Sequence, residues 1–213
     1  MKIYLLRHGK SAEHQKQIRQ HPGSDLGPQG KKQAKRVAKR LMAEPIEVII
    51  SSPWPRALTT AKIVAKALQL PVVVDDRAHE IMQNPILNGL PYGHELALEY
   101  IETVKKGGKD VDWKFRGGGE SIRDVLNRAR EFKADLLKKY LGQNVLFVSH
   151  GYFLSSLASL FLAGDETDDQ ILRGIVVATL SYENTGLSLI EYIENVDTWK
   201  LMYFNDHSHL KKS

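Results

Sequence analysis

The chain has 213 residues, of which 42% are hydrophobic, and it carries a net charge of +5 and no cysteine. This length can bury one substantial core, so we expect a single domain over residues 1–213 with an insertion at about 75–118. The lack of cysteine excludes disulfides, thiolate catalysis and cysteine-ligated zinc. No signal peptide precedes the first apolar run, and we expect a cytoplasmic location.

The hydrophobic pattern predicts strands and helices that alternate along the chain. Strands are expected at 2–7, 46–51, 72–74 and 144–149, and helices at 28–42, 53–69, 93–105, 121–140 and 151–162. Three further strands are expected near 175–182, 186–193 and 198–204. This order favours an α/β fold, a three-layer α/β/α sandwich with a mainly parallel sheet. The last strands add antiparallel pairing near the C-terminus.

Local signals predict where two of the helices begin. Ser121 and Asp124 have the spacing of a capping box, in which each side chain satisfies a backbone N–H of the other residue. Ser52 is expected to cap the helix at 53–69, with Pro53 in its first turn, where a missing N–H costs nothing. This start places Arg56 one turn into the helix, close to the end of the preceding strand.

Two glycine runs interrupt the insertion, Gly107-Gly108 and Gly117-Gly118-Gly119. The second run is not a dinucleotide-binding loop, because no strand precedes it and its spacing is wrong. Lys109 after the first run likewise lacks the pattern of a nucleotide-binding P-loop. We therefore interpret both runs as turns.

Two segments bear on possible partners. Residues 145–163 are nearly uncharged and about long enough to cross a membrane, but we interpret them as a buried strand, a turn and a helix, with a membrane span as the alternative. Residues 31–40 hold six Lys and Arg and no acid, and we interpret them as the solvated face of an amphipathic helix. Attraction of an acidic substrate or partner and nucleic-acid binding are the alternatives. We expect neither a nucleic acid nor a membrane as partner.

Two short motifs point to chemistry. Arg7-His8-Gly9 follows the first predicted strand, and Ser149-His150-Gly151 follows the strand at 144–149. Arg56 follows a third strand. The carboxyl ends of parallel strands meet at one edge of a sheet, where ligands of α/β proteins bind. We therefore expect two arginines and two histidines to share a site.

These residue types suit a phosphoryl group. Arg7 and Arg56 can supply planar, bidentate donors, and helix N–H groups near Gly151 can add to them. One of His8 and His150 could attack phosphorus while the other, protonated, stabilises the phosphoryl oxygens. No dense carboxylate cluster is visible, so no metal and no other cofactor is expected.

The remaining histidines are interpreted as non-catalytic. They are His14, His21, His79 and His94, expected in polar loops, and His207 and His209, for which a solvated tail is favoured over a metal site.

The sequence as a whole resembles the histidine phosphatase superfamily, in its branch similar to cofactor-dependent phosphoglycerate mutases. The motifs that carry the resemblance are Arg7-His8-Gly9, Ser51-Ser52-Pro53 with Arg56-Ala57 and Thr60-Ala61, Gly119-Glu120-Ser121 and Ser149-His150-Gly151. Leu26 with Gly30-Lys31-Lys32-Gln33-Ala34, and Asn205-Asp206 with His209-Leu210, resemble two further segments of the family.

The resemblance implies roles for these residues. His8 would be the phosphorylated nucleophile, and Arg7, Arg56 and His150 would hold the phosphoryl group. The family acid lies after the third strand, which makes Glu80 the candidate, with a structural role for Glu80 as the alternative. Two other carboxylates, Glu95 and Glu120, are lesser candidates. His14 stands where many members carry an asparagine that contacts the phosphate, and it joins the predicted phosphate-binding residues with Gly151.

The expected function is that of a metal-independent phosphomonoester hydrolase that acts through a phosphohistidine, with a small phosphorylated metabolite as substrate. Three alternatives stay open: a cofactor-dependent phosphoglycerate mutase, a phosphoprotein phosphatase and a non-catalytic module that binds phosphorylated ligands. Specificity is expected to reside in residues 10–25 and 75–118. The sequence indicates no oligomeric state.

Overall fold

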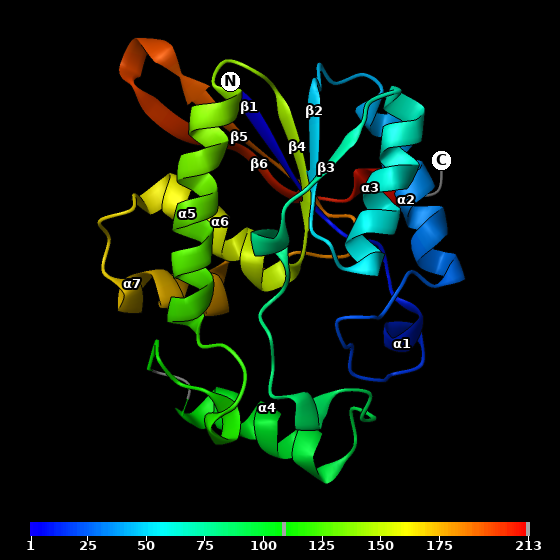
Figure 1. Ribbon diagram of the computed structural model, residues 1–213, viewed down its shortest axis with the longest axis vertical. Coiled ribbons are helices and arrows are strands. Elements are labelled where there is room, and N and C mark those ends of the chain that lie inside the picture. The colour runs from blue at the N-terminus through cyan, green and yellow to red at the C-terminus, as the bar shows by residue number, and fades with distance from the viewer. Residues whose placement is uncertain (108–109, 212–213) are drawn as a thin grey trace.

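The computed structural model describes residues 1–107 and 110–211, and it holds a six-stranded sheet between two helical layers (Figure 1). The strands are β1 (Lys2–Arg7), β2 (Val48–Ser51), β3 (Val72–Val74), β4 (Val145–Ser149), β5 (Leu187–Ile193) and β6 (Thr198–Asp206). Their order across the sheet is β3-β2-β4-β1-β5-β6. Strands β1 to β4 pair in parallel, and β5 and β6 add antiparallel pairs. The predicted sandwich with antiparallel pairing near the C-terminus is confirmed.

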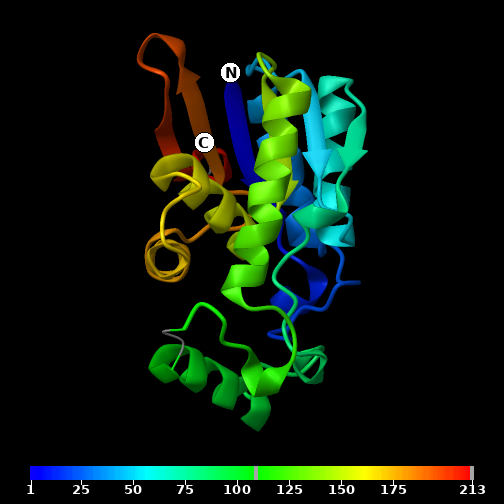
Figure 2. The ribbon, with the colours of Figure 1, turned by 60° about the vertical axis from the view of Figure 1, so that its left-hand side comes forward.

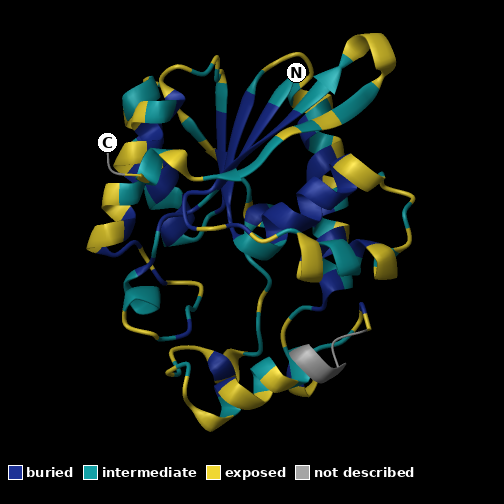
Figure 3. Ribbon diagram, turned by 180° about the vertical axis from the view of Figure 1, so that it is seen from behind, coloured by how far each residue is buried: buried dark blue, intermediate teal, exposed yellow. Residues whose placement is uncertain are grey.

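Helices cover both faces of this sheet (Figure 2). The α-helices of the described residues are α1 (Ala12–Gln15), α2 (Pro28–Leu41), α3 (Pro55–Leu68), α4 (Glu95–Gly107), α5 (Ile122–Tyr140), α6 (Gly151–Ala163) and α7 (Asp169–Gly174), of which α2 and α3 cover one face and α5 and α6 the other. Alternate residues of β1 serve opposite faces: Ile3 and Leu5 join the core under α5 and α6, whereas Tyr4 and Leu6 join the core under α2 and α3. The central strands are accordingly buried on both sides (Figure 3).

Between β3 and α5 the chain leaves the sandwich and extends past the carboxyl edge of the sheet, where α4 lies (Figure 1). The helix expected at 93–105 is present as α4, in the segment predicted as an insertion. Where this segment ends, at the start of α5, the predicted capping box is confirmed. The Ser121 N–H donates to the Asp124 carboxylate at 2.8 Å, and the Asp124 N–H donates to the Ser121 hydroxyl at 3.2 Å. Gly117 ends a 3-10 turn at Phe115–Gly117 and Gly119 forms an isolated β-bridge with Gln83, whereas Gly108 and Lys109 lie outside the described residues.

The strand expected near 175–182 is wrong. Ile175–Thr179 is a π-helical turn that directly follows α7. Its β-branched residues resemble those of a strand, but the segment does not join the sheet, in which β5 pairs with β1 and β6. The segment instead packs against α6 and buries Val176. Tertiary packing thus overrides local propensity here.

The predicted start of α3 is also wrong, by two residues. The N-cap residue is Trp54 and the helix begins at Pro55, so Arg56 lies at its second position. Ser52 does not cap the helix, because its hydroxyl accepts the Trp54 N–H at 3.2 Å and contacts His150. The serine therefore belongs to a turn between β2 and α3.

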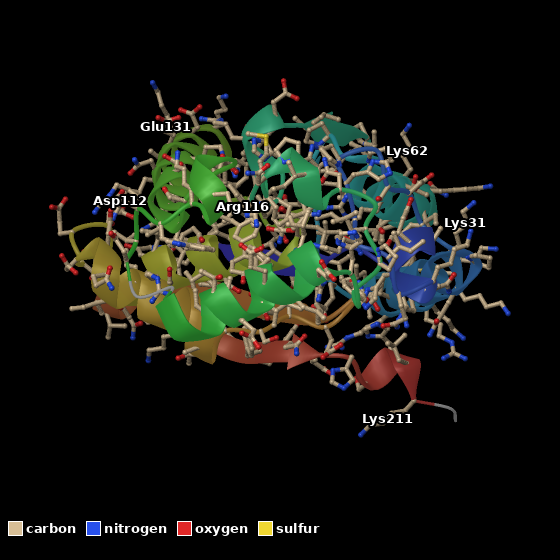
Figure 4. All side chains as sticks on the ribbon, turned by 90° about the horizontal axis from the view of Figure 1, so that it is seen from below. Lys31, Lys62, Asp112, Arg116, Glu131 and Lys211 are labelled. Atoms are coloured by element: carbon tan, nitrogen blue, oxygen red, sulfur yellow. The ribbon has the colours of Figure 1, made fainter. Side chains whose placement is uncertain are left out.

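The basic segment forms the outer face of α2, as predicted, and its apolar residues Ala34, Val37, Ala38 and Leu41 are buried. In Figure 4, Lys31 of α2 and Lys62 of α3 point outward on the same side. The uncharged stretch 145–163 is β4 followed by α6, as interpreted above. Over the described parts of the chain, no helix is long and apolar enough to span a bilayer.

Candidate active site

The ends of three adjacent parallel strands build one site. β1 leads into His8, β4 into His150 and β2 into Ser52, and β4 lies between the other two. The rings of His8 and His150 are 5.0 Å apart between centroids. The sheet therefore brings together the two histidine motifs that the sequence separates by more than a hundred residues, as predicted.

His8 is held in one orientation and is almost fully buried, with 1% of its surface exposed. Its Nδ1 lies 2.7 Å from the Gly9 carbonyl oxygen, an acceptor, so Nδ1 carries the proton. The other ring nitrogen, Nε2, accepts the Nε–H of Arg56 at 3.2 Å. Burial, and then the charges of Arg56 and Arg7, hold the pKa of His8 well below its usual range. His8 therefore presents a neutral ring with a lone pair on Nε2.

His150 caps α6 and lies across from His8. Its Nε2 is 2.8 Å from the hydroxyl of Ser52, and its buried Nδ1 has no partner. The ring of Trp54 contacts it edge-on at 5.1 Å. Burial, and then the charge of Arg56, hold the pKa of His150 well below its usual range. In this structure His150 is thus neutral, and the predicted role as a protonated phosphate ligand would require the charge that a bound phosphoryl group brings.

The two predicted arginines border the histidines. The Arg7 guanidinium donates to the carbonyl of Tyr182, and its Nε is buried without a partner. Arg56 donates to the carbonyl of His21 at 3.1 Å and lies 4.7 Å above the Trp54 ring. Burial lowers the pKa of Arg56 to about 10 and also lowers that of Arg7. Both groups remain cations at neutral pH and face a common cavity.

Glu80 contacts the first turn of α6. Its Oε1 accepts the backbone N–H groups of Ile81, Tyr152 and Phe153 at 2.9, 3.1 and 3.3 Å. Its Oε2 accepts only the Tyr152 N–H, at 3.3 Å. An added Cβ on Gly151 would lie 3.7 Å from this oxygen and 3.9 Å from the Arg7 guanidinium carbon. The carboxylate therefore occupies the helix terminus that the sequence suggested for phosphate, with one oxygen facing Arg7.

The two lesser candidates for the acid lie elsewhere. Glu120 forms a two-bond ion pair with Arg128, at 2.9 Å for both bonds, and accepts the Met82 N–H at 2.8 Å. Arg128 also donates to the carbonyls of Arg77 and His79, so this pair fixes the backbone around Glu80. Glu95 is exposed at the start of α4. The structure thus gives Glu120 a positioning contact and brings only Glu80 to the histidines.

A cavity of about 250 Å³ opens in front of these residues. Arg7, Arg56, Glu80 and His14 line it, and the buried Nδ1 of His14 has no partner. Burial lowers the pKa of His14. Gly151 lies in a second cavity of about 220 Å³ that shares Arg7 and Glu80 with the first.

Residues from distant segments contact the loop that carries His8 and Gly9. An added Cβ on Gly9 would lie 2.6 Å from the Gly30 carbonyl oxygen, so only glycine lets the loop approach α2 this closely. The side chain of Asn184 donates to the His8 carbonyl at 3.0 Å, and the Thr185 hydroxyl lies 3.1 Å from Nε2 of His209. Asn184 and Thr185 lie in a turn before β5, and this turn holds the backbone of His8.

His209 differs from the predicted solvated tail. It is half-buried against Thr185, and burial lowers its pKa to about 4. His207 is exposed, as expected. Within the described ranges, no group of three His, Cys, Asp or Glu is placed to hold a metal ion.

Sequence reasoning missed several residues of the site. Trp54 and Tyr152 line the cavity, as does the buried Arg19, and none of the three was singled out. Trp54 lies between Ser52 and Arg56, inside a motif identified in the sequence, and this position could have indicated that it belongs to the site. Arg19 and Tyr152 reach the cavity through long-range packing, for which the sequence offered no local signal.

Comparisons with known proteins agree with this geometry. The family model for the histidine phosphatase superfamily (branch 1) matches residues 3–207. Phosphoserine phosphatase 1 of Hydrogenobacter thermophilus is 33% identical over 153 residues, covering 70% of this chain and 71% of that protein. A probable phosphoglycerate mutase of Enterobacter sp. is 28% identical over 218 residues, covering 99% and 95% of the two chains. The solved structure of Bacillus stearothermophilus YhfR has a TM-score of 0.81 at 26% identity and 99% coverage of both chains. The chain belongs to the histidine phosphatase superfamily, branch 1.

Proposed function

We propose that the protein is a metal-independent phosphomonoester hydrolase that acts on a small phosphorylated metabolite through a phosphohistidine at His8. Membership of the superfamily, with a phosphoserine phosphatase among the relatives, supports a phosphatase activity. The observation that carries the proposal is the state of His8: its Nδ1 is bonded to the Gly9 carbonyl, and its Nε2 lone pair faces Arg56. A cavity of about 250 Å³ suits a small substrate.

In the first step, Nε2 of His8 forms a bond to phosphorus while the bond from phosphorus to the ester oxygen breaks. Arg7 and Arg56 stabilise the charge on the phosphoryl oxygens, which removes the need for a metal ion. Protonated Glu80 transfers its proton to the departing alkoxide. The Oε2 atom suits this role, because Oε1 already accepts three N–H groups.

In the second step, water attacks phosphorus, its proton passes to the Glu80 carboxylate, and the nitrogen–phosphorus bond breaks. Inorganic phosphate leaves and His8 regains its lone pair. His150 lies 5.0 Å from His8 and would hold a phosphoryl oxygen once protonated. The dianion itself would favour that protonation by raising the pKa of the ring.

A phosphoglycerate mutase is the second candidate, because a probable mutase aligns with 99% of the chain. A mutase must return the phosphoryl group to the product rather than to water. The two functions are separated by supplying 3-phosphoglycerate with a trace of 2,3-bisphosphoglycerate and measuring both released phosphate and 2-phosphoglycerate. Phosphate release from a panel of phosphorylated metabolites supports the hydrolase. Isomerisation without phosphate release would replace it with the mutase, and binding without either reaction would indicate a non-catalytic module.

A further inference from the structure

The active-site cavity contains a third arginine, which forms no ion pair with a carboxylate among the described residues. Arg19 lies in the loop between α1 and α2, lines the cavity with Arg7 and Arg56, and is only 7% exposed. Among the residues that the structure describes, none gives it a carboxylate partner. Its Nε is buried without any hydrogen-bond acceptor. Burying a cation in this way is costly unless a partner of opposite charge is supplied.

Neutral contacts hold this guanidinium in place. The side-chain oxygen of Gln83 accepts one of its N–H groups, and the Tyr100 ring lies 4.6 Å below it. The Gln83 amide in turn donates to the Tyr100 hydroxyl at 3.2 Å. Burial raises the pKa of Tyr100, so the phenol stays neutral and does not offset the charge of Arg19. The positive charge therefore remains available to a ligand.

The backbone around Arg19 is also fixed. Its N–H donates to the Leu90 carbonyl at 2.8 Å, and its carbonyl accepts the Gly89 N–H at 3.2 Å. Ile18 and Pro91 form an isolated antiparallel bridge between the same two segments. The loop before α2 and the segment before α4 thus form one wall of the cavity, and the guanidinium is set in that wall before any ligand arrives. A preorganised donor of this kind favours binding because little freedom is lost.

The charges lining the cavity indicate what the ligand carries. In the proposed mechanism Glu80, which lines the same cavity, is protonated when the substrate binds. Arg7 and Arg56 then match the two charges of a phosphoryl dianion, and Arg19 adds one further positive charge. The neighbouring His14 adds none, since burial lowers its pKa. A carboxylate carries the one negative charge that matches a single guanidinium, and its two oxygens fit the parallel N–H groups.

We propose that Arg19, held by Gln83 and Tyr100, is a specificity-determining residue that binds a carboxylate on the phosphorylated substrate. This assignment rests on the proposed function for the identity of the phosphate pocket. The substrates would then be phosphomonoesters that carry a carboxylate a few bonds from the ester oxygen. The phosphate lies between Arg7 and Arg56, and the carboxylate points to the wall formed by the two loops.

The test compares 3-phosphoglycerate with glycerol 3-phosphate, which has a hydroxymethyl group in place of the carboxylate. Binding is measured by calorimetry in a His8→Ala background, where the ligands are not consumed. We expect 3-phosphoglycerate to bind roughly tenfold to a hundredfold more tightly, the range for a hydrogen bond to a charged group. Adding Arg19→Gln should bring the ratio of the two dissociation constants close to one, and Arg19→Lys should restore part of it. Lys16→Gln is the matched control, since it removes an exposed cation from the same loop and should leave the ratio unchanged.

Several outcomes would overturn the assignment. They are an equal affinity of the parent for the two ligands, an unchanged ratio in Arg19→Gln, or an equal fall in the ratio for Lys16→Gln. Tighter binding of propane-1,3-diol bisphosphate than of 3-phosphoglycerate would show that a second phosphate, not a carboxylate, is the preferred group. Hydrolysis of p-nitrophenyl phosphate by the unsubstituted chain is measured separately. A failure of that reaction counts against the proposed hydrolase and leaves the binding ratio as a test of Arg19.

Discussion

The Nε–H of Arg56 points at Nε2 of His8, 3.2 Å away, and so marks the nitrogen that carries the lone pair. The contact has two consequences. It opposes protonation of His8, because a positive charge on the ring would face the guanidinium. It also places Arg56 where an incoming phosphoryl group would meet both the proposed nucleophile, His8, and a cation. The hydrogen bond would then pass from the ring to a phosphoryl oxygen.

His8→Ala should lose on the order of a thousandfold or more in turnover, because removing a nucleophile eliminates the covalent route. Brief mixing of the unsubstituted protein with labelled substrate, followed by a denaturing quench, should trap a phosphoryl group on His8. A phosphohistidine is labile in acid and survives base, unlike a phosphoserine ester. Peptide mapping of the trapped protein locates the label. Acid-stable label, or label on His150, would contradict the assignment.

The parts of the site that follow strands were predictable from the sequence. His8 and His150 follow the apolar runs of β1 and β4, Arg56 follows β2 after a short turn, and parallel strands bring such positions to one edge. The two histidine motifs, which share this pattern, were therefore enough to predict where most of the candidate site lies. The capping box at Ser121 was predictable for a similar reason, since both of its partners lie within one turn.

Other parts depend on contacts between segments distant in sequence, and the sequence did not show them. The bonds from the first turn of α6 to Glu80 join residues more than seventy positions apart. The contact of Arg19 with Gln83 depends on how the loop before α2 meets the segment before α4. The error at 175–182 has the same origin, because the β-branched run is helical where it packs against α6.

Activity should not require a divalent metal, because Arg7 and Arg56 supply the positive charge at the phosphoryl site. Turnover of p-nitrophenyl phosphate in excess EDTA should match turnover in added Mg²⁺. Vanadate should inhibit competitively, since it adopts the trigonal bipyramidal geometry expected at phosphorus during transfer. If EDTA abolishes activity and Mg²⁺ restores it, the arginine-based mechanism is wrong.

Stability should fall as the pH drops below about 6.5. The folded state lowers the pKa of both His8 and His150, mainly by burying them, whereas the unfolded chain protonates them near 6.5. Below that pH the unfolded state binds more protons, so acid favours unfolding, by at most about 1.4 kcal/mol per pH unit for each ring. The contribution is fully present above pH 6.5 and is lost as the pH falls toward the folded-state pKa values.

Denaturant midpoints measured between pH 7.5 and 5 test this linkage. His8→Asn should flatten the decline, because one of the two buried rings is gone. His94→Asn is the control, since His94 is exposed, its replacement removes no buried ring, and the Asn side chain can accept the Leu96 N–H that Nδ1 of His94 accepts. If the denaturant midpoints of all three proteins fall with the same slope, carboxylates and not the active-site rings determine the loss of stability in acid.

Glu80→Gln should slow the phosphorylation step in a way that depends on the leaving group. An alkoxide from a sugar or glycerol phosphate is strongly basic and needs a proton, whereas p-nitrophenolate leaves almost unaided. General acid catalysis contributes roughly a hundredfold to ten-thousandfold, so the loss on alkyl phosphates should approach that range and the loss on p-nitrophenyl phosphate should be small. The substitution is conservative, because the amide oxygen of Gln can still accept the N–H groups of Tyr152 and Phe153.

Single-turnover kinetics are the measurement, since a slow second step would hide the difference under steady-state conditions. Glu120→Gln is the matched control: it weakens the pair with Arg128 that fixes the backbone near Glu80, and it removes no proton donor from the cavity. Any loss in that variant should therefore be similar for alkyl and aryl substrates. The assignment of Glu80 depends on the contrast between the two variants. Equal losses on both substrates in Glu80→Gln would show that Glu80 only caps α6 and that another group donates the proton.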